Sequence, residues 1–232
     1  MIKFTTQLIA IISTSLYVSH AQINRIFVGA NAGIQATSIL NKNDLDEGGQ
    51  LDYSTPYKFQ FGIDLGYIVT KRFAFQTGAI YSQQGQNYVT NGNALADFKT
   101  ELNYIKIPLL ANWTINPDRK CNFGLQFGFQ FSILNSAKSS RSKINSNQAP
   151  FGYYSSNLFV VDDFYSSVNL DFVVGPSVSY KLNDRMRLGG VLRLDYSLSD
   201  IEKKESKPSI RDISNNVTIC LPQLFFHYIF SK

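Results

Sequence analysis

Between Ser166 and Leu198 the chain alternates apolar and polar residues along two arms, which a short polar turn at 181–185 separates. A period of two is the pattern of a β-strand with two different faces, because successive side chains point to opposite sides of the sheet. The two arms therefore predict an antiparallel hairpin with one apolar and one polar face. The apolar face holds Val168, Leu170, Phe172, Val174, Val178 and Tyr180 in the first arm, and Met186, Leu188, Leu192, Leu194, Tyr196 and Leu198 in the second.

The same alternation recurs in six further segments, each bounded by polar or turn-forming residues. Together with the hairpin they predict eight strands. Pro108 has no N–H to donate to a neighbouring strand, so we expect a local bulge there. The six segments run from about Arg25 to Ile34, Tyr57 to Thr70, Phe73 to Gln84, Thr100 to Ile115, Cys121 to Ile133, and Asn216 to Phe230.

The connections between these strands alternate in length. Long polar segments follow the first, third, fifth and seventh strands, and turns of a few residues follow the second, fourth and sixth. Short turns at one end and long loops at the other are typical of outer-membrane barrels. The sequence thus predicts an all-β fold, an eight-stranded antiparallel up-and-down transmembrane β-barrel with both termini periplasmic. The alternative is a soluble barrel of the lipocalin kind, whose apolar face points inward.

The first 21 residues have the form of a secretory signal peptide. Lys3 supplies a positive start, an apolar stretch runs from Leu8 to Val18, and small residues stand at Ser19 and Ala21. The apolar stretch is shorter than the roughly 20 residues that a membrane-spanning helix needs. We therefore expect cleavage after Ala21, which leaves residues 22–232 as one outer-membrane β-barrel domain.

The polar faces of the expected strands carry charged residues, which would point into the barrel interior. An eight-stranded barrel is just wide enough for side chains to fill it, and buried charges persist only when they are paired. We expect a structural salt-bridge network that fills the interior, with a proton or small-ion path as the alternative. Its members would be Arg25, Lys58, Asp64, Lys106, Asp171, Arg187, Arg193 and Asp195.

Two stretches resemble a known family. The segment Leu102–Leu110 reads LNYIKIPLL, and the hairpin continues from Asp171 through Gly189-Gly190 to Leu198. In this order they resemble strands of the PorT-like outer-membrane β-barrel family of Bacteroidota, which the cleavage site before Gln22 also fits. The resemblance spans nearly all of the mature chain and implies an eight-stranded outer-membrane barrel. Some members of that family are associated with type IX protein secretion and gliding.

Catalysis has little support in the sequence. His227 is the only histidine after residue 21, and no acidic residue stands near it in the chain, whereas nucleophilic triads need a base oriented by a carboxylate. We expect no enzyme activity and no cofactor or metal. A lipid-modifying or proteolytic barrel is the alternative. Cys121 and Cys220 are expected to be free thiols on the apolar face.

Two groups of loop residues invite a binding function, but each suits a solvated loop better. Acidic residues in the first loop offer oxygen ligands for Ca²⁺ without the spacing of an EF-hand. Basic residues in the third loop offer contacts to lipopolysaccharide phosphates. The acidic group is Asp44, Asp46, Glu47 and Asp52, and the basic group is Lys138, Arg141 and Lys143.

The expected function is that of a structural or interaction barrel that acts through its extracellular loops. The alternatives are a subunit of an envelope machinery, such as type IX secretion, and a narrow channel or transporter. The expected partners are outer-membrane lipid and lipopolysaccharide, the barrel-assembly machinery during biogenesis, and other envelope proteins. The net charge of +5 is not gathered into one basic stripe, so nucleic acid is not an expected partner.

Overall fold

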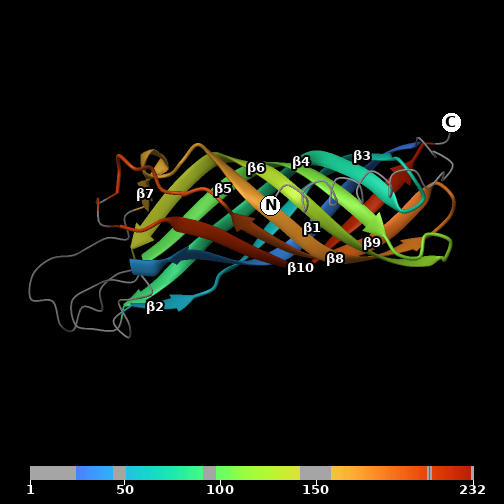
Figure 1. The fold of residues 1–232 in the computed structure, drawn as a ribbon. Coiled ribbons are helices and arrows are strands. Elements are labelled where there is room, and N and C mark those ends of the chain that lie inside the picture. The colour runs from blue at the N-terminus through green and yellow to red at the C-terminus, as the bar shows by residue number, and fades with distance from the viewer. Residues whose placement is uncertain are drawn as a thin grey trace, which may run out of the picture.

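Eight long strands dominate the computed structural model, which describes residues 25–43, 51–90, 98–141, 158–207, 209 and 211–230 (Figure 1). Two short strands, β2 (Leu51–Ser54) and β7 (Leu158–Val160), pair with β4 and β6 respectively. The long strands are β1 (Arg25–Asn41), β3 (Tyr57–Ile68), β4 (Phe73–Thr90), β5 (Phe98–Thr114), β6 (Cys121–Arg141), β8 (Val168–Lys181), β9 (Met186–Ser197) and β10 (Ser214–Ile229).

The eight long strands close into an antiparallel barrel. Each strand pairs with its neighbours in chain order, and the pairing of β1 with β10 closes the sheet. The turns after β3, β5 and β8 lie at one end, together with the start of β1 and the end of β10. The end opposite carries β2 and β7, as the left side of Figure 1 shows. The predicted eight-stranded, antiparallel, up-and-down barrel is confirmed.

Several strands run further toward the long-loop end than the sequence predicted. β1 continues to Asn41 instead of ending near Ile34, and β6 continues to Arg141. The prediction ended these strands where the apolar face stops. The backbone pairing continues there, because polar side chains such as Gln35, Thr37 and Asn41 are buried against neighbouring strands.

The apolar residues point outward and the polar residues point inward. Ile63 is 66% exposed, whereas its neighbour on the chain, Asp64, is 3% exposed. The same contrast repeats around the barrel, for example between Phe131, which is exposed, and Gln130, which is buried. A soluble barrel with an apolar interior is therefore the wrong reading of this chain. Among the described residues no helix has the length and apolar character needed to span a bilayer.

The expected bulge at Pro108 is wrong. Pro108 pairs in register with Gln130, and the register on both sides of it is unbroken. A missing N–H costs one ladder hydrogen bond but does not by itself insert a residue into the strand. The bulge between β5 and β6 lies between Asn103 and Tyr104, where β6 contributes one extra residue.

The two cysteines are free, but they do not share a face. Cys121 is exposed and Cys220 is buried on the interior side, close to Gly33. The expected apolar-face position of Cys220 is therefore wrong. The register of β10 against β9 shifts between Cys220 and Gln223. Because the bulge adds one residue, even-numbered residues face inward before it and odd-numbered residues face inward after it. The outward set of Leu224 and Phe226 consequently cannot be extended back to Cys220.

Candidate functional site

The middle of the barrel interior contains a buried cluster of opposite charges. Asp195 Oδ2 lies 2.7 Å from Lys106 Nζ, and Asp195 Oδ1 lies 2.7 Å from Arg193 Nε. Arg193 and Asp195 are two residues apart on β9, so their side chains share the inner face. Lys106 reaches them from β5, and its side chain has no exposed surface. Two cations thus share one buried carboxylate.

Gln130 on β6 extends this cluster to a second carboxylate. Its Nε2 donates to Asp195 Oδ2 at 3.0 Å and to Asp171 Oδ2 at 2.8 Å. Its Oε1 accepts a hydrogen bond from the guanidinium of Arg193, and the Ser132 hydroxyl donates to Asp171. The cluster therefore joins four neighbouring strands, β5, β6, β8 and β9, across the interior. We call Lys106, Gln130, Asp171, Arg193 and Asp195 the central cluster.

A third carboxylate, Asp64, is held on the opposite wall. Asn31 and Gln76 donate to Asp64 Oδ1 at 2.8 and 2.9 Å, and His227 Nε2 lies 3.2 Å from Asp64 Oδ2. The imidazole lies between two phenyl rings, Phe27 and Phe225, with ring centroids 4.5 Å away on each side. This environment holds the histidine in a fixed position against its carboxylate.

Gly29 makes the His227–Asp64 contact possible. Both residues are cross-strand partners of Gly29, one on β10 and the other on β3. A Cβ atom at Gly29 would lie 2.3 Å from His227 Cδ2 and 2.4 Å from the Phe226 carbonyl oxygen. The absent side chain leaves the space through which the imidazole reaches across β1. Among the described residues, no Ser hydroxyl or Cys thiol forms a hydrogen bond with His227.

The structure divides the eight expected interior charges into separate groups. Lys106, Asp171, Arg193 and Asp195 come together in the central cluster, and Asp64 pairs with His227 instead of a lysine or arginine. Lys58 pairs with Glu101 at 2.8 Å. Arg25 and Arg187 lie toward the short-turn end of the barrel. Neither has a carboxylate partner among the residues that the structure describes.

The participants absent from the predicted set include Gln130, Glu101, and His227 as the partner of Asp64. The face parity of Gln130 and His227 was available in the sequence, since both alternate with outward residues. Their partners were not, because these depend on the strand register. Glu101 stands in the part of β5 that was expected near a loop, and no pattern in the sequence connects it with Lys58.

Apolar side chains occupy part of each end of the interior. At the long-loop end Tyr165 and Ile201 come from the connections, so two loops fold over this mouth. At the short-turn end an apolar cluster covers the wall formed by β1, β3, β4 and β10. The long-loop cluster comprises Ile39, Leu102, Tyr104, Ala137 and Ile201, with Leu134, Val161 and Tyr165 against it; the short-turn cluster comprises Phe27, Ile68 and Ile229, with Ala74 against it.

The β9–β10 connection is organised around Asp200. Its carboxylate accepts backbone N–H bonds from Glu202 and Ser214, each at 3.1 Å, and pairs with the Lys207 ammonium. Partial burial acts to raise the pKa of Asp200, but these hydrogen bonds outweigh it, and the pKa lies below its ordinary value. Arg211 forms a second, two-point contact with Glu202, with distances of 2.7 and 2.9 Å.

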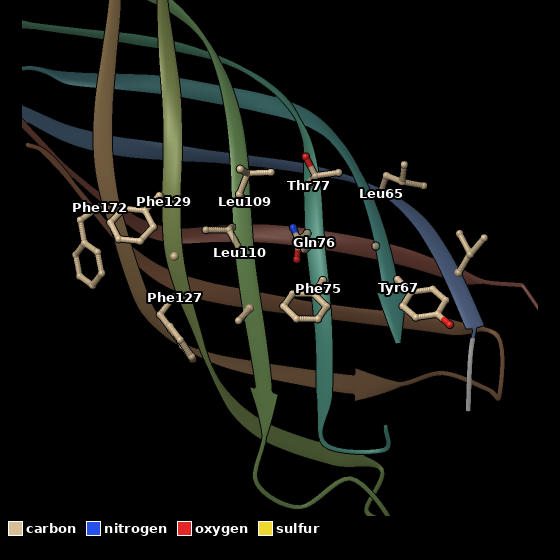
Figure 2. A pocket seen from close by; sticks show the side chains of 14 residues that line it. Leu65, Tyr67, Phe75, Gln76, Thr77, Leu109, Leu110, Phe127, Phe129 and Phe172 are labelled. Atoms are coloured by element: carbon tan, nitrogen blue, oxygen red, sulfur yellow. The ribbon is translucent and has the colours of Figure 1, made fainter. Parts of the chain in front are cut away.

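The outer wall has an apolar recess over β3 to β6, shown in Figure 2. Its volume is about 680 Å³. The side chains of Leu65, Phe75, Leu109 and Phe127 stand around it, and the smaller Thr77 leaves the hollow between them. Such a surface offers dispersion contacts and no polar anchor.

The remaining binding hypotheses fall largely outside the described residues. Asp44, Asp46, Glu47 and Lys143 are not described, and neither are the side chains of Asp52 and Arg141. Lys138 lies in β6 opposite Val160 of β7. Within the described ranges, no group of three or more His, Cys, Asp or Glu residues is arranged to hold a metal ion.

Solved structures with a similar fold include three outer-membrane proteins. The outer membrane protease OmpT from Escherichia coli aligns with a TM-score of 0.51 at 11% identity, covering 90% of this chain and 97% of that one. Neisserial surface protein A aligns with a TM-score of 0.45 at 14% identity, covering 88% and 97%. OprG from Pseudomonas aeruginosa aligns with a TM-score of 0.45 at 12% identity, covering 92% and 99%. At these identities the likeness concerns the fold alone.

A comparison with curated protein sequences returned no match. The family model described as "Outer membrane protein beta-barrel domain" matches residues 19–203, which is more than half of the chain. The closed barrel, with its apolar outer wall and its polar interior, agrees with this match. The chain therefore belongs to the family of outer membrane protein beta-barrel domains, and its place is the outer membrane.

Proposed function

We propose that this protein is an outer-membrane barrel with a filled interior, which acts as a structural or interaction module through its extracellular loops. The observation that carries this proposal is the central cluster. Lys106 and Arg193 are almost completely buried, and both pair with Asp195 in the middle of the interior. An ion that crossed there would have to break contacts between fully desolvated charges, which is costly.

The loops support the interaction half of the proposal. The connection before β8 and the β9–β10 connection meet at the long-loop mouth. There the Ser166 N–H donates to the Ile201 carbonyl at 2.8 Å, and the backbones of Tyr165 and Glu202 form an isolated antiparallel β-bridge. Phe164 is 53% exposed beside them, in the short helix η2 (Asp162–Phe164). An ordered platform with an exposed aromatic ring is suited to a protein or surface partner.

The orientation and the leader sequence belong to the same proposal. The short turns and both ends of the described barrel would face the periplasm, after removal of residues 1–21 as a signal peptide. The apolar wall, including the recess of Figure 2, would contact lipid acyl chains, and basic loop residues would lie near lipopolysaccharide. Insertion would use the barrel-assembly machinery. PorT-like membership, with a role in an envelope machinery, is the narrower alternative.

Conductance in planar bilayers tests the filled interior. Purified protein that migrates as a folded barrel should give no stepwise openings, whereas a general porin measured in the same bilayers should. Steady openings of the folded protein would contradict the proposal and support the narrow-channel alternative.

Site-specific photo-crosslinking in whole envelopes tests the interaction role. A photoreactive residue at Phe164 samples the loop mouth, and one at Leu182, which is 52% exposed after β8, samples the turn end. We expect a discrete protein adduct from the Phe164 position. Adducts from Leu182 alone would instead support membership of a periplasm-facing machinery.

A further inference from the structure

The short-turn mouth of the barrel contains a small cavity that the function proposed above does not use. Its volume is about 70 Å³. One side is formed by the short-turn apolar cluster and Phe225. The polar part of the lining comes from β5, β8, β9 and β10. Its polar lining includes Asn112, Thr114, Ser177, Ser179, Arg187 and His227.

Arg187 lies in this lining without a counter-ion among the residues that the structure describes. It faces the interior near the start of β9, between Lys181 on β8 and His227 on β10. No hydrogen bond or ion pair joins it to any described residue, and none of the described lining residues is Asp or Glu. The other cation in the lining, Lys71, already pairs with Asp118 at 2.9 Å. A guanidinium has five donors and stays charged, so it favours an anionic partner.

The surrounding groups add donors and little competing negative charge. Ser177 and Ser179 line the same cavity from the inner face of β8, where their cross-strand partners on β9 are Val191 and Gly189. The carboxylate that His227 contacts, Asp64, is not part of the lining and is already engaged by Asn31 and Gln76. The cavity thus presents a positive charge and neutral donors to whatever enters from the mouth.

We propose that this mouth binds one small tetrahedral oxyanion, such as phosphate or sulfate, through Arg187 with the two serine hydroxyls. Arginine forms paired, charge-assisted hydrogen bonds with such oxyanions. The cavity volume of about 70 Å³ is several times the roughly 10–15 Å³ that one water needs, so a small ion can enter it. A phospholipid headgroup is disfavoured, because the cavity lies inside the barrel wall and lipid contacts the outside.

Titration calorimetry of the folded barrel in detergent tests this site. Sodium phosphate is injected at constant ionic strength, with sodium chloride as the blank. The wild-type protein should bind one phosphate saturably, and Arg187→Gln should weaken the affinity at least tenfold. Arg185→Gln is the matched control, because Arg185 is exposed in the turn two residues away and the charge change is the same.

Two further variants keep the test decisive. Arg187→Lys retains the charge but loses the planar fork, so its affinity should lie between those of the wild type and Arg187→Gln. The double variant Ser177→Ala/Ser179→Ala should weaken phosphate binding without a change of charge. It provides the test of the site if Arg187→Gln does not fold. Absence of saturable binding, or equal loss in Arg185→Gln and Arg187→Gln, would overturn the inference. The test in detergent does not depend on the proposed orientation or on the role of the loops.

Discussion

Asp195 stabilises two buried cations at once, and this makes it the most sensitive single residue of the interior. Both of its oxygens are occupied, one by Arg193 and the other by Lys106 and Gln130. Removing one member of a buried ion pair leaves the others without compensation, which typically costs about 3–5 kcal/mol. We therefore expect the central cluster to contribute to the stability of the folded barrel.

Asp195→Asn should destabilise the folded barrel by about 3–5 kcal/mol, because Lys106 and Arg193 lose their shared charge. Urea unfolding in lipid vesicles, followed through the single tryptophan Trp113, would measure the change. Asp118→Asn is the control, since it removes an ion pair with Lys71 that is largely open to water. A midpoint for Asp195→Asn that matches the wild type would show that the cluster is dispensable.

The cysteines give a chemical test of which side chains face inward. Cys121 is exposed, whereas Cys220 is 1% exposed and lies on the interior side of the barrel wall. One thiol per molecule should therefore react with a maleimide in the folded protein and two in the denatured protein, as counted by mass spectrometry. Cys121→Ser should leave no fast-reacting thiol. Rapid labelling of Cys220 in the folded Cys121→Ser protein would place it on the outer face after all.

At the scale of single elements, the β9–β10 connection owes its order to a few polar contacts. Asp200 accepts two backbone hydrogen bonds and pairs with Lys207, while Arg211 pairs with Glu202. Little apolar surface is buried in this connection apart from Ile201. Protonation of the carboxylates in this connection should therefore disturb its structure far more than that of the barrel wall.

The lowered pKa of Asp200 predicts how this loop responds to acid. A carboxyl group whose pKa is lower in the folded protein stabilises the fold at pH values above its ordinary pKa. This stabilisation is lost as the pH falls through the pKa of the folded protein. The protection factors of the amides in residues 200–207 and 211–214, that is, their exchange rates relative to the intrinsic rate at the same pH, should be high at neutral pH and should fall once the pH drops below the ordinary range of an aspartate carboxyl. Asp200→Asn should cause the same loss of protection at neutral pH, whereas Asp212→Asn, at an exposed neighbouring position, should not.

The whole molecule is a closed sheet whose two faces are suited to different surroundings. The outer face offers apolar side chains to lipid, and many polar side chains of the inner face form hydrogen bonds or ion pairs from strand to strand. A closed sheet has no free edge at which unfolding can begin by fraying. The fold is thus kept together by the ladder around the full circumference and by the interior contacts.

The closed barrel should persist in dodecyl sulfate at room temperature and unfold on boiling. The expected observation is a faster-migrating gel band before heating and a slower one after it. Asp195→Asn should convert to the slow form at a lower temperature than the wild type, because it retains the ladder but loses the interior pairing. Identical migration before and after boiling would contradict a stable barrel.

The amino-acid sequence by itself determined the two faces, the number of long strands and the alternation of short turns with long loops. These features depend on local period and composition, which can be read from one segment at a time. The outward positions of Phe131 and Ile63 were predictable in this way. So was the burial of Lys106 and Arg193 on the inner face.

Only the tertiary structure decided which inward residues meet. Asp64 and His227 are 163 positions apart, and Lys106 and Asp195 are 89 positions apart. Face parity says that a side chain points inward, but its partner depends on the register of every strand between the two, and a single bulge changes that register. The bulge after Cys220 shows this directly, and it is the reason why the position of that thiol could not be derived from the alternation.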